Sequence, residues 1–135
     1  MKELNAAINS RLSGDATLQA LATGGAHLLR APDEAAAPYC VFGKLDGNAS
    51  YTFSRLACDD LIYYAKGVAH DWDAAADIAA RAAELLTDQE AALPLAGDQR
   101  VAYIRRQGSI DYINTEAGVD FYNVGFTFRI MVTPS

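Results

Sequence analysis

The stretch from Asp71 to Asp88, DWDAAADIAARAAELLTD, constrains the fold of this chain more than any other segment. Its apolar residues recur at helical spacing and form one stripe, which predicts a helix from Trp72 to Thr87. Asp71 or Asp73 can cap the start of this helix, where the helix dipole favours negative charge. Because the stripe is rich in alanine, another backbone surface can approach it closely, and a sheet is the expected partner. The stripe consists of Trp72, Ala75, Ala76, Ile78, Ala79, Ala82, Leu85 and Leu86.

The end of the chain carries the clearest strand signal. From Tyr122 to Val132 the even-numbered residues are apolar and the odd-numbered ones mostly polar, as expected for a strand with one buried face. A strand over 100–107, with a bulge at Gly108 and a continuation through 109–114, precedes it. These segments predict a long hairpin between 101–113 and 119–132.

The first half of the chain predicts two short helical segments and three strands. Asp15 can cap the second helical segment, and the prolines at 32 and 38 bound a loop before the first strand. Asp46-Gly47-Asn48 predicts a hairpin turn, and Asp59-Asp60 predicts a break between the second and third strands. The predicted helical segments are Lys2–Leu12 and Ala16–Ala22, and the predicted strands are Tyr39–Leu45, Tyr51–Ala57 and Leu61–Val68.

Together these elements predict a single α+β domain over residues 1–135. Its β-sheet is expected to be largely antiparallel, with a mixed sheet as the alternative. One central amphipathic helix packs on a face of this sheet, and the domain also has a short N-terminal helix. A chain of 135 residues that is 51% hydrophobic can bury a core without metal or disulfides. Cys40 and Cys58 each lie in an apolar, strand-like segment, and without a signal peptide they are expected to be buried free thiols in a reducing compartment.

The formal net charge of −6 is unevenly distributed and argues against nucleic acid as the main partner. Residues 71–98 contain seven acids and one base, whereas Arg100, Arg105 and Arg106 follow directly. The simpler interpretation is a solvated helix face. The more specific interpretation is a self-complementary surface, acidic in one patch and basic in another, for head-to-tail contact between copies. No segment resembles a signal peptide, and no apolar run has the length of a membrane span, so no membrane partner is expected.

No residue pattern predicts catalysis, a cofactor or a metal site. His27 and His70 stand apart from other ligands, and neither cysteine has a base near it in the sequence. A small enzyme with an acidic cleft remains an alternative that would require carboxylates or a histidine converging in a deep pocket. A small-ligand site lined by tyrosines is another alternative, although packing on the core or on a neighbour is the simpler role for them. The tyrosines concerned are Tyr39, Tyr51, Tyr63 and Tyr64.

The pattern as a whole resembles phage tail-completion, or tail-terminator, proteins. The resemblance rests on Leu4, Ile8 and Leu12, on GDATLQAL, and on the proline-bounded loop that ends in Pro38-Tyr39-Cys40-Val41-Phe42-Gly43. It continues through the Tyr63-Tyr64 strand, the helix that begins at an aspartate, the Leu93-Pro94-Leu95 loop and the alternating final strand. It covers nearly the whole chain in element order, and no single motif is diagnostic.

This resemblance implies a non-enzymatic virion protein, assembled in the host cytoplasm, that forms a ring at the head–tail junction. Such a ring, expected to be a hexamer, stops polymerisation of the tail tube and presents a docking face to the head connector. Its partners would be its own copies, the tail-tube protein and the connector protein. The charge distribution suggests that Asp77 and Glu84 of one subunit face Arg100, Arg105 and Arg106 of the next. The alternatives within this class are a head-closure or connector component and a tail-tube subunit.

Overall fold

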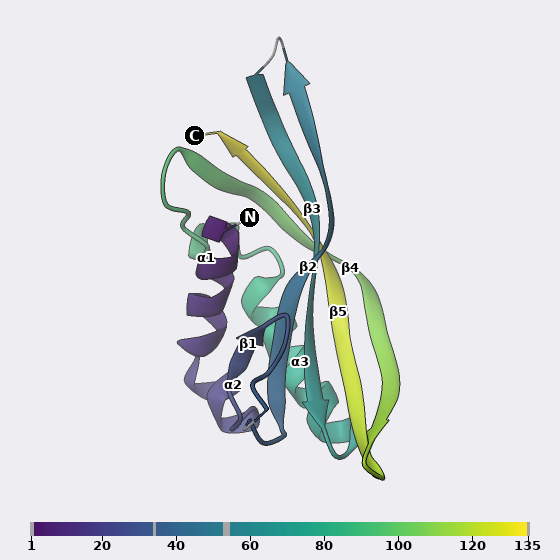
Figure 1. The fold of residues 1–135 in the computed structure, drawn as a ribbon. Coiled ribbons are helices and arrows are strands. Elements are labelled where there is room, and N and C mark those ends of the chain that lie inside the picture. Colours follow the sequence, from purple (N-terminus) through teal and green to yellow (C-terminus); the bar gives the residue numbers. More distant parts are fainter. Residues whose placement is uncertain (1, 34, 53–54, 135) are drawn as a thin grey trace.

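The protein is described by a computed structural model that covers residues 2–33, 35–52 and 55–134. Helices and a sheet form two layers, with the helices on one face of the sheet (Figure 1). The helices are α1 (Lys2–Ser13), α2 (Ala16–Leu21), α3 (Trp72–Leu86) and the 3-10 turn η1 (Glu90–Ala92). The strands are β1 (Ala26–Leu28), β2 (Tyr39–Thr52), β3 (Arg55–Ala69), β4 (Gln99–Glu116) and β5 (Val119–Pro134).

The five strands form one mixed sheet in the order β1-β2-β3-β5-β4. Neighbours from β2 to β4 pair antiparallel, whereas β1 pairs parallel with β2 at Cys40–Phe42. The α+β class, the central helix and the short N-terminal helix are therefore confirmed. The β4–β5 hairpin is also confirmed, with a register shift between Arg106 and Gly108 where the sequence predicted a bulge.

α3 lies across β3 and β5 and buries the alanine-rich stripe that the sequence predicted. Asp71 caps this helix by accepting the Ala74 N–H at 2.8 Å. The helix approaches β3 so closely at Gly67 that an added Cβ would lie 2.4 Å from the carbonyl oxygen of Ala75. Trp72 was wrongly assigned to the stripe, because its side chain is 46% exposed. The buried residues of α3 are Ala75, Ile78, Ala79, Ala82, Ala83, Leu85 and Leu86.

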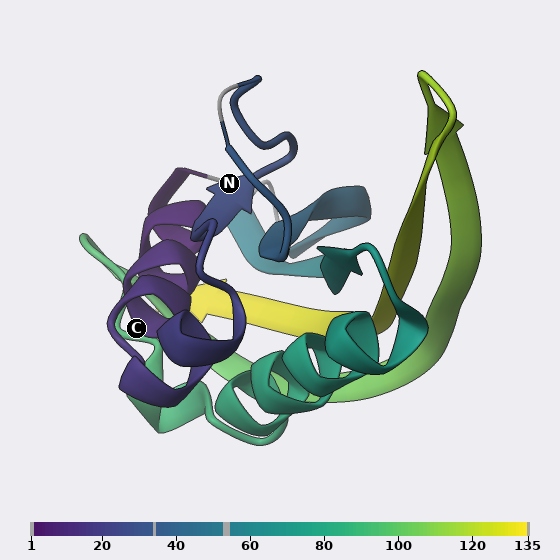
Figure 2. The ribbon, with the colours of Figure 1, turned by 90° about the horizontal axis from the view of Figure 1, so that it is seen from below.

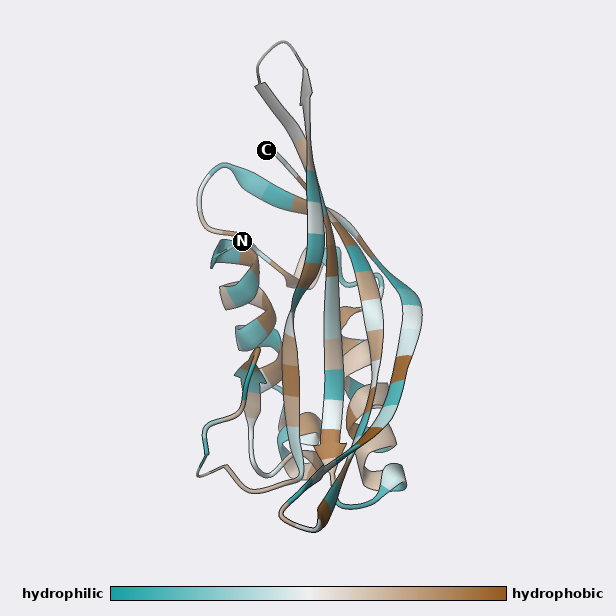
Figure 3. Ribbon diagram, turned by 45° about the vertical axis from the view of Figure 1, so that its right-hand side comes forward, coloured by the Kyte–Doolittle hydropathy of each residue, from teal (hydrophilic) through white to brown (hydrophobic). Residues whose placement is uncertain are grey.

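The alternation predicted for the last strand correctly separates the two faces of the sheet. Phe128, Ile130 and Val132 are at most 1% exposed on the face that α3 and α1 cover. Arg129 and the other odd-numbered residues lie on the opposite face, which we call the open face. The β4–β5 hairpin and the loop after β1 both rise on this side, away from α3 (Figure 2). Figure 3 shows hydrophilic and hydrophobic residues alternating along these strands.

Two local predictions in the first half were wrong. Asp46-Gly47-Asn48 does not turn the chain, because β2 continues past it to Thr52 with a register shift at Leu45. Asp59-Asp60 does not break a strand, because both residues pair within the continuous strand β3. The predicted strand Tyr51–Ala57 is therefore divided between the end of β2 and the start of β3, and its residues 53–54 lie outside the described residues.

Candidate assembly surfaces

The three arginines that the sequence grouped into one patch lie at different places on β4. Arg105 lies opposite Arg129 on the open face, with its guanidinium 4.9 Å from the ring centre of Tyr103. Arg106 points to the helix-covered face, where it lies 4.7 Å from the ring centre of Phe126. Arg100 is exposed near the start of β4, about 20 Å further along the strand. The strand therefore presents two separate basic positions on opposite faces and a third at its end.

The two acids predicted to face them, Asp77 and Glu84, lie on the exposed side of α3. Glu84 accepts a hydrogen bond from Arg81 at 2.9 Å, so part of its charge is neutralised within the chain. Because Asp77, Arg81 and Glu84 follow one another at helical spacing, they share one stripe of the helix surface. The acidic character of this stripe therefore comes mainly from Asp77.

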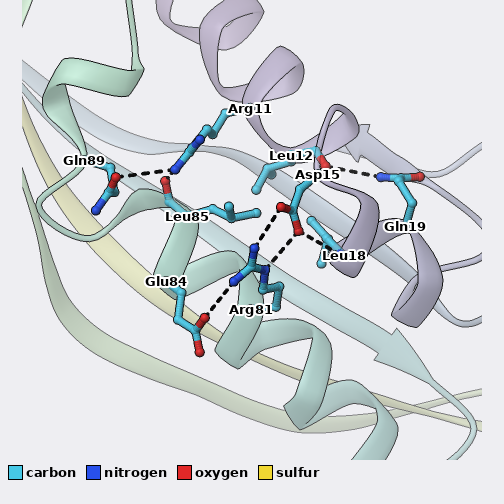
Figure 4. Close-up of polar contacts among 9 residues, drawn as sticks. All are labelled: Arg11, Leu12, Asp15, Leu18, Gln19, Arg81, Glu84, Leu85 and Gln89. Carbon is cyan, nitrogen blue, oxygen red and sulfur yellow. Dashed lines mark hydrogen bonds and ion pairs between the residues drawn. The ribbon is translucent and has the colours of Figure 1, made fainter.

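Arg81 also ties α3 to the start of α2 (Figure 4). Its Nε and Nη2 donate to the two carboxylate oxygens of Asp15 at 2.9 and 2.8 Å. Asp15 caps α2 at the same time, because it accepts the Leu18 N–H at 2.8 Å. The hydrogen bonds from Arg81 and the backbone bond from Leu18 lower the pKa of Asp15 to about 2, against an opposing effect of burial.

A second link holds α1 against the end of α3. Arg11 donates from Nε to the carbonyl oxygen of Leu85 at 3.1 Å and from Nη2 to Gln89 at 3.4 Å (Figure 4). A cation beside the last carbonyls of a helix is favoured by the helix dipole. These two links fix the helical layer as one unit behind the sheet.

The open face carries a groove of about 340 Å³ between the loop after β1 and the β4–β5 hairpin. Lys66 and Tyr112 lie in it, and the Lys66 ammonium donates to the Tyr112 hydroxyl at 2.7 Å. Among the described residues no carboxylate lies within ion-pair distance of Lys66. Sequence reasoning missed this groove, because three separate segments come together to form it and none of them carries a motif.

The tyrosines proposed as a ligand cleft do not converge. Tyr39 lines the groove on the open face, whereas Tyr63 is 1% exposed in the core and donates to Asn5 at 2.6 Å. Tyr64 lies on the open face over Gly43, and burial raises its pKa. The side chain of Tyr51 lies outside the described residues. Tyr63 and Tyr64 lie on opposite faces of the sheet because successive side chains of a strand alternate in direction.

Titratable and nucleophilic groups are dispersed over the molecule. His27 contacts the Gly24 carbonyl at 2.7 Å, and His70 contacts the Asp120 carbonyl at 3.3 Å beside the turn of the β4–β5 hairpin. Neither histidine lines the groove on the open face or a second groove of about 490 Å³ beside α1.

Cys40 is fully buried, as predicted, and burial raises its pKa to about 12, whereas Cys58 is half-buried. In 2–33, 35–52 and 55–134, no three His, Cys, Asp or Glu residues group as a metal site would require. No helix in the same ranges has the length and hydropathy of a membrane span.

Solved structures share this fold over almost its whole length. A chain of a structure described as the virion of a native gene transfer agent particle superposes with a TM-score of 0.73 at 19% identity. That match covers 96% of both chains. A second solved structure superposes with a TM-score of 0.60 at 19% identity, over 99% of this chain and 96% of the other. No protein-family model matches the sequence, and no curated protein matches it.

Proposed function

We propose that this chain is a structural protein of a phage-like virion, and that it forms the terminator ring at the head-proximal end of a tail tube. The observation that carries the proposal is the shared fold with a chain of a gene transfer agent virion, at a TM-score of 0.73 over 96% of both chains. The element order that resembles tail-completion proteins points independently in the same direction. The ring would stop tube polymerisation and offer a docking face to the head connector.

The arrangement of the sheet supports head-to-tail contact between copies. Its two outer strands, β1 and β4, differ in length, direction and charge, so the two flanks of one subunit are different surfaces. Contact between unlike flanks is heterologous, and it closes into a ring when the rotation between copies divides a full turn. A hexamer is the form we propose.

Charge placement supports a specific pairing within that ring. Asp77 and Glu84 on α3 of one subunit would face Arg105 or Arg106 on β4 of the next, with Arg100 at the end of the same strand. Because Arg105 and Arg106 point to opposite faces of β4, only one of them can meet the neighbouring helix layer. Arg106 is the better candidate, since it lies on the face that carries the helices.

The mechanism would be assembly, with no bond made or broken and no cofactor required. The partners would be other copies, the tail-tube protein and the head connector, at the head–tail junction of a virion assembled in the host cytoplasm. A head-closure component or a tail-tube subunit remains the second candidate, because these components are expected to share the α+β style and the ring geometry.

Mass measurement by light scattering tests the ring proposal directly. We expect a discrete oligomer, near six times the 14.5 kDa chain, that persists on dilution into the micromolar range. A tail-tube subunit would instead form polymers of open-ended mass. A strict monomer that also fails to associate with tail tubes would contradict the proposal.

A further inference from the structure

The sheet has two backbone edges that are open over long stretches. β4 pairs on its inner side with β5 along its whole length. On its outer side, the Asp88 N–H bonds to the carbonyl of Ile104 at 3.0 Å and closes the edge there. From Arg105 to Glu116 the outer side has no strand partner in the described part of the chain. Such an edge is a template for pairing with another chain.

On the opposite side of the sheet, the outer backbone edge of β2 is also open over part of its length. β1 covers β2 only at Cys40–Phe42, and the Leu29 N–H adds one bond to the carbonyl of Phe42. Beyond this point, Lys44–Ala49 is exposed and has no outer strand partner among the described residues. Neither open stretch contains a proline, the residue that most simply blocks edge pairing.

The strand directions allow these two edges to join. Because β2, β3, β5 and β4 pair antiparallel in succession, β4 runs opposite to β2. A copy related by rotation about an axis along the strands would therefore bring β4 beside β2 in an antiparallel pair. That pairing would continue the alternation already present in the sheet.

The register of the sheet excludes pairing at the same height. Lys44 pairs with Tyr63, which pairs with Phe128. Phe128 in turn pairs with Arg106, so Lys44 and Arg106 lie in one row and on one face. Joining copies at this height would place two cations opposite each other, and the next part of β2 would meet the edge that Asp88 closes.

A staggered alignment separates the two cations and moves the edge closed by Asp88 beyond Ala49. It also limits the contact to Arg106–Asp111, because Ile113 would lie opposite Phe42, which β1 already covers. The stagger must be an even number of residues, since an odd shift would move the helices to opposite faces. Asp111 pairs with Val124 on the helix-covered face, about four ladder steps from the Arg106 row. A shift of this size places Lys44 opposite Asp111 and Ala49 opposite Arg106.

The stagger also has a reasonable size for a closed assembly. Four residues correspond to about 13 Å along a strand, and four strands span about 19 Å across the sheet. The ratio corresponds to a strand tilt of about 35°, at the lower end of the ~35–45° that closed sheets require. Asp111 is already oriented, because it accepts the Trp72 indole N–H at 3.2 Å.

We infer that a second copy of this chain docks the outer edge of its β2, Lys44–Ala49, antiparallel on the β4 edge, with Lys44 opposite Asp111. The inference deepens the proposed ring and rests on it. It assigns the subunit contact to backbone pairing along β2 and β4, with one charge pair fixing the alignment.

Disulfide trapping tests the alignment. Variants Lys44→Cys and Asp111→Cys, each with Cys58→Ser so that the buried Cys40 is the only native thiol left, are mixed under conditions of assembly and oxidised. Directly opposite residues in an antiparallel pair have Cα atoms about 4.5–5.5 Å apart, within disulfide range. We expect a covalent dimer from this mixture, and about tenfold less when Arg106→Cys or Ile113→Cys replaces Asp111→Cys. A dominant product with either replacement would overturn the proposed alignment.

Charge exchange supplies a second measurement. Lys44→Asp should weaken association by about 2- to 5-fold per contact, and adding Asp111→Lys should restore it. If wild-type rings are seen by electron microscopy but no cysteine pair is trapped, the edge contact is wrong and the ring remains. If the wild-type protein forms no ring even with tail tubes, both the ring and the edge contact are wrong.

Discussion

Arg81 of α3 donates two hydrogen bonds, at 2.8 and 2.9 Å, to Asp15, which also caps the first turn of α2. One carboxylate thus serves two helices that are far apart in the sequence. Its side chain is 17% exposed, and that of Arg81 is 28% exposed, so solvent screens the pair only partly. This contact fixes the helical layer that carries Asp77 and Glu84, the acids of the proposed subunit contact.

Replacement of Asp15 by alanine should destabilise the fold. The variant loses a helix cap, worth about 0.5–2 kcal/mol, together with a partly buried ion pair, so we expect a total loss of about 1–3 kcal/mol. Urea unfolding measures it. Asp33→Ala is the matched control, because the Arg30–Asp33 pair is 81% and 90% exposed and should contribute almost nothing. Equal midpoints for the two variants would contradict the role of Asp15.

The same carboxylate should shape the acid side of the stability curve. Its pKa is lowered to about 2 in the folded protein, from an ordinary value of 3.8. A carboxylate with a lowered pKa stabilises the fold at pH values above its pKa in the unfolded chain. That contribution is lost as the pH falls from about 5 toward 2. Arg129 lowers the pKa of Asp60 and adds a contribution of the same sign. Asp15→Asn should therefore flatten the decline in unfolding free energy between pH 5 and pH 2. An unchanged slope would contradict this assignment.

The close approach of α3 to β3 makes Gly67 sensitive to any side chain. An added Cβ would lie 2.4 Å from the Ala75 carbonyl oxygen and 2.7 Å from the Cβ of Ile78, atoms that cannot move without shifting the helix. Gly67→Ala should cost about 1–3 kcal/mol in thermal or urea unfolding. Gly108→Ala is the control, because its Cβ would meet only the Thr127 hydroxyl at 3.0 Å. Similar losses for the two variants would refute the close packing.

The two cysteines should differ in reactivity. Cys40 is fully buried and its pKa is raised to about 12, so almost no thiolate is present at neutral pH. A thiol reagent should modify Cys58 first in the native protein and both cysteines at equal rates in urea. Fast modification of Cys40 in a Cys58→Ser variant would show that the core opens readily.

Charge reversal distinguishes which of the two adjacent arginines, Arg105 or Arg106, takes part in the proposed subunit contact. Arg106→Glu should weaken assembly, because this side chain lies on the helix-covered face near the proposed neighbour. Arg105→Glu, on the open face, should have a smaller effect, and it serves as the control with the same net charge. Sedimentation at physiological salt measures the assembled fraction. If both variants assemble like the wild type, the arginines have no part in the contact.

The sequence predicts those elements whose periodicity is local and long. The stripe of α3 and the alternation of β5 each persist over many residues, so both helix and strand could be placed. The turn predicted at Asp46-Gly47-Asn48 failed because pairing with β3 on either side outweighs the local preference of these residues. β1 was missed because it is three residues long and pairs parallel with a strand beyond the loop.

The positions of the residues in the proposed assembly surfaces were harder to predict than the elements that carry them. Arg105 and Arg106 are adjacent in the sequence, but the strand places them on opposite faces. Trp72 fits the helical stripe by spacing, yet it is the first residue of α3, is 46% exposed and bonds to Asp111 of β4. The groove on the open face depends on how the β4–β5 hairpin curves, and no local pattern encodes that curvature.

Electron microscopy of the protein mixed with assembled tail tubes of the same particle tests the terminator role most directly. A terminator should form one short ring on a single end of each tube, and that end should not grow further when tube subunits are added. Binding along the tube wall, incorporation into a longer tube, or no binding at either end would contradict it.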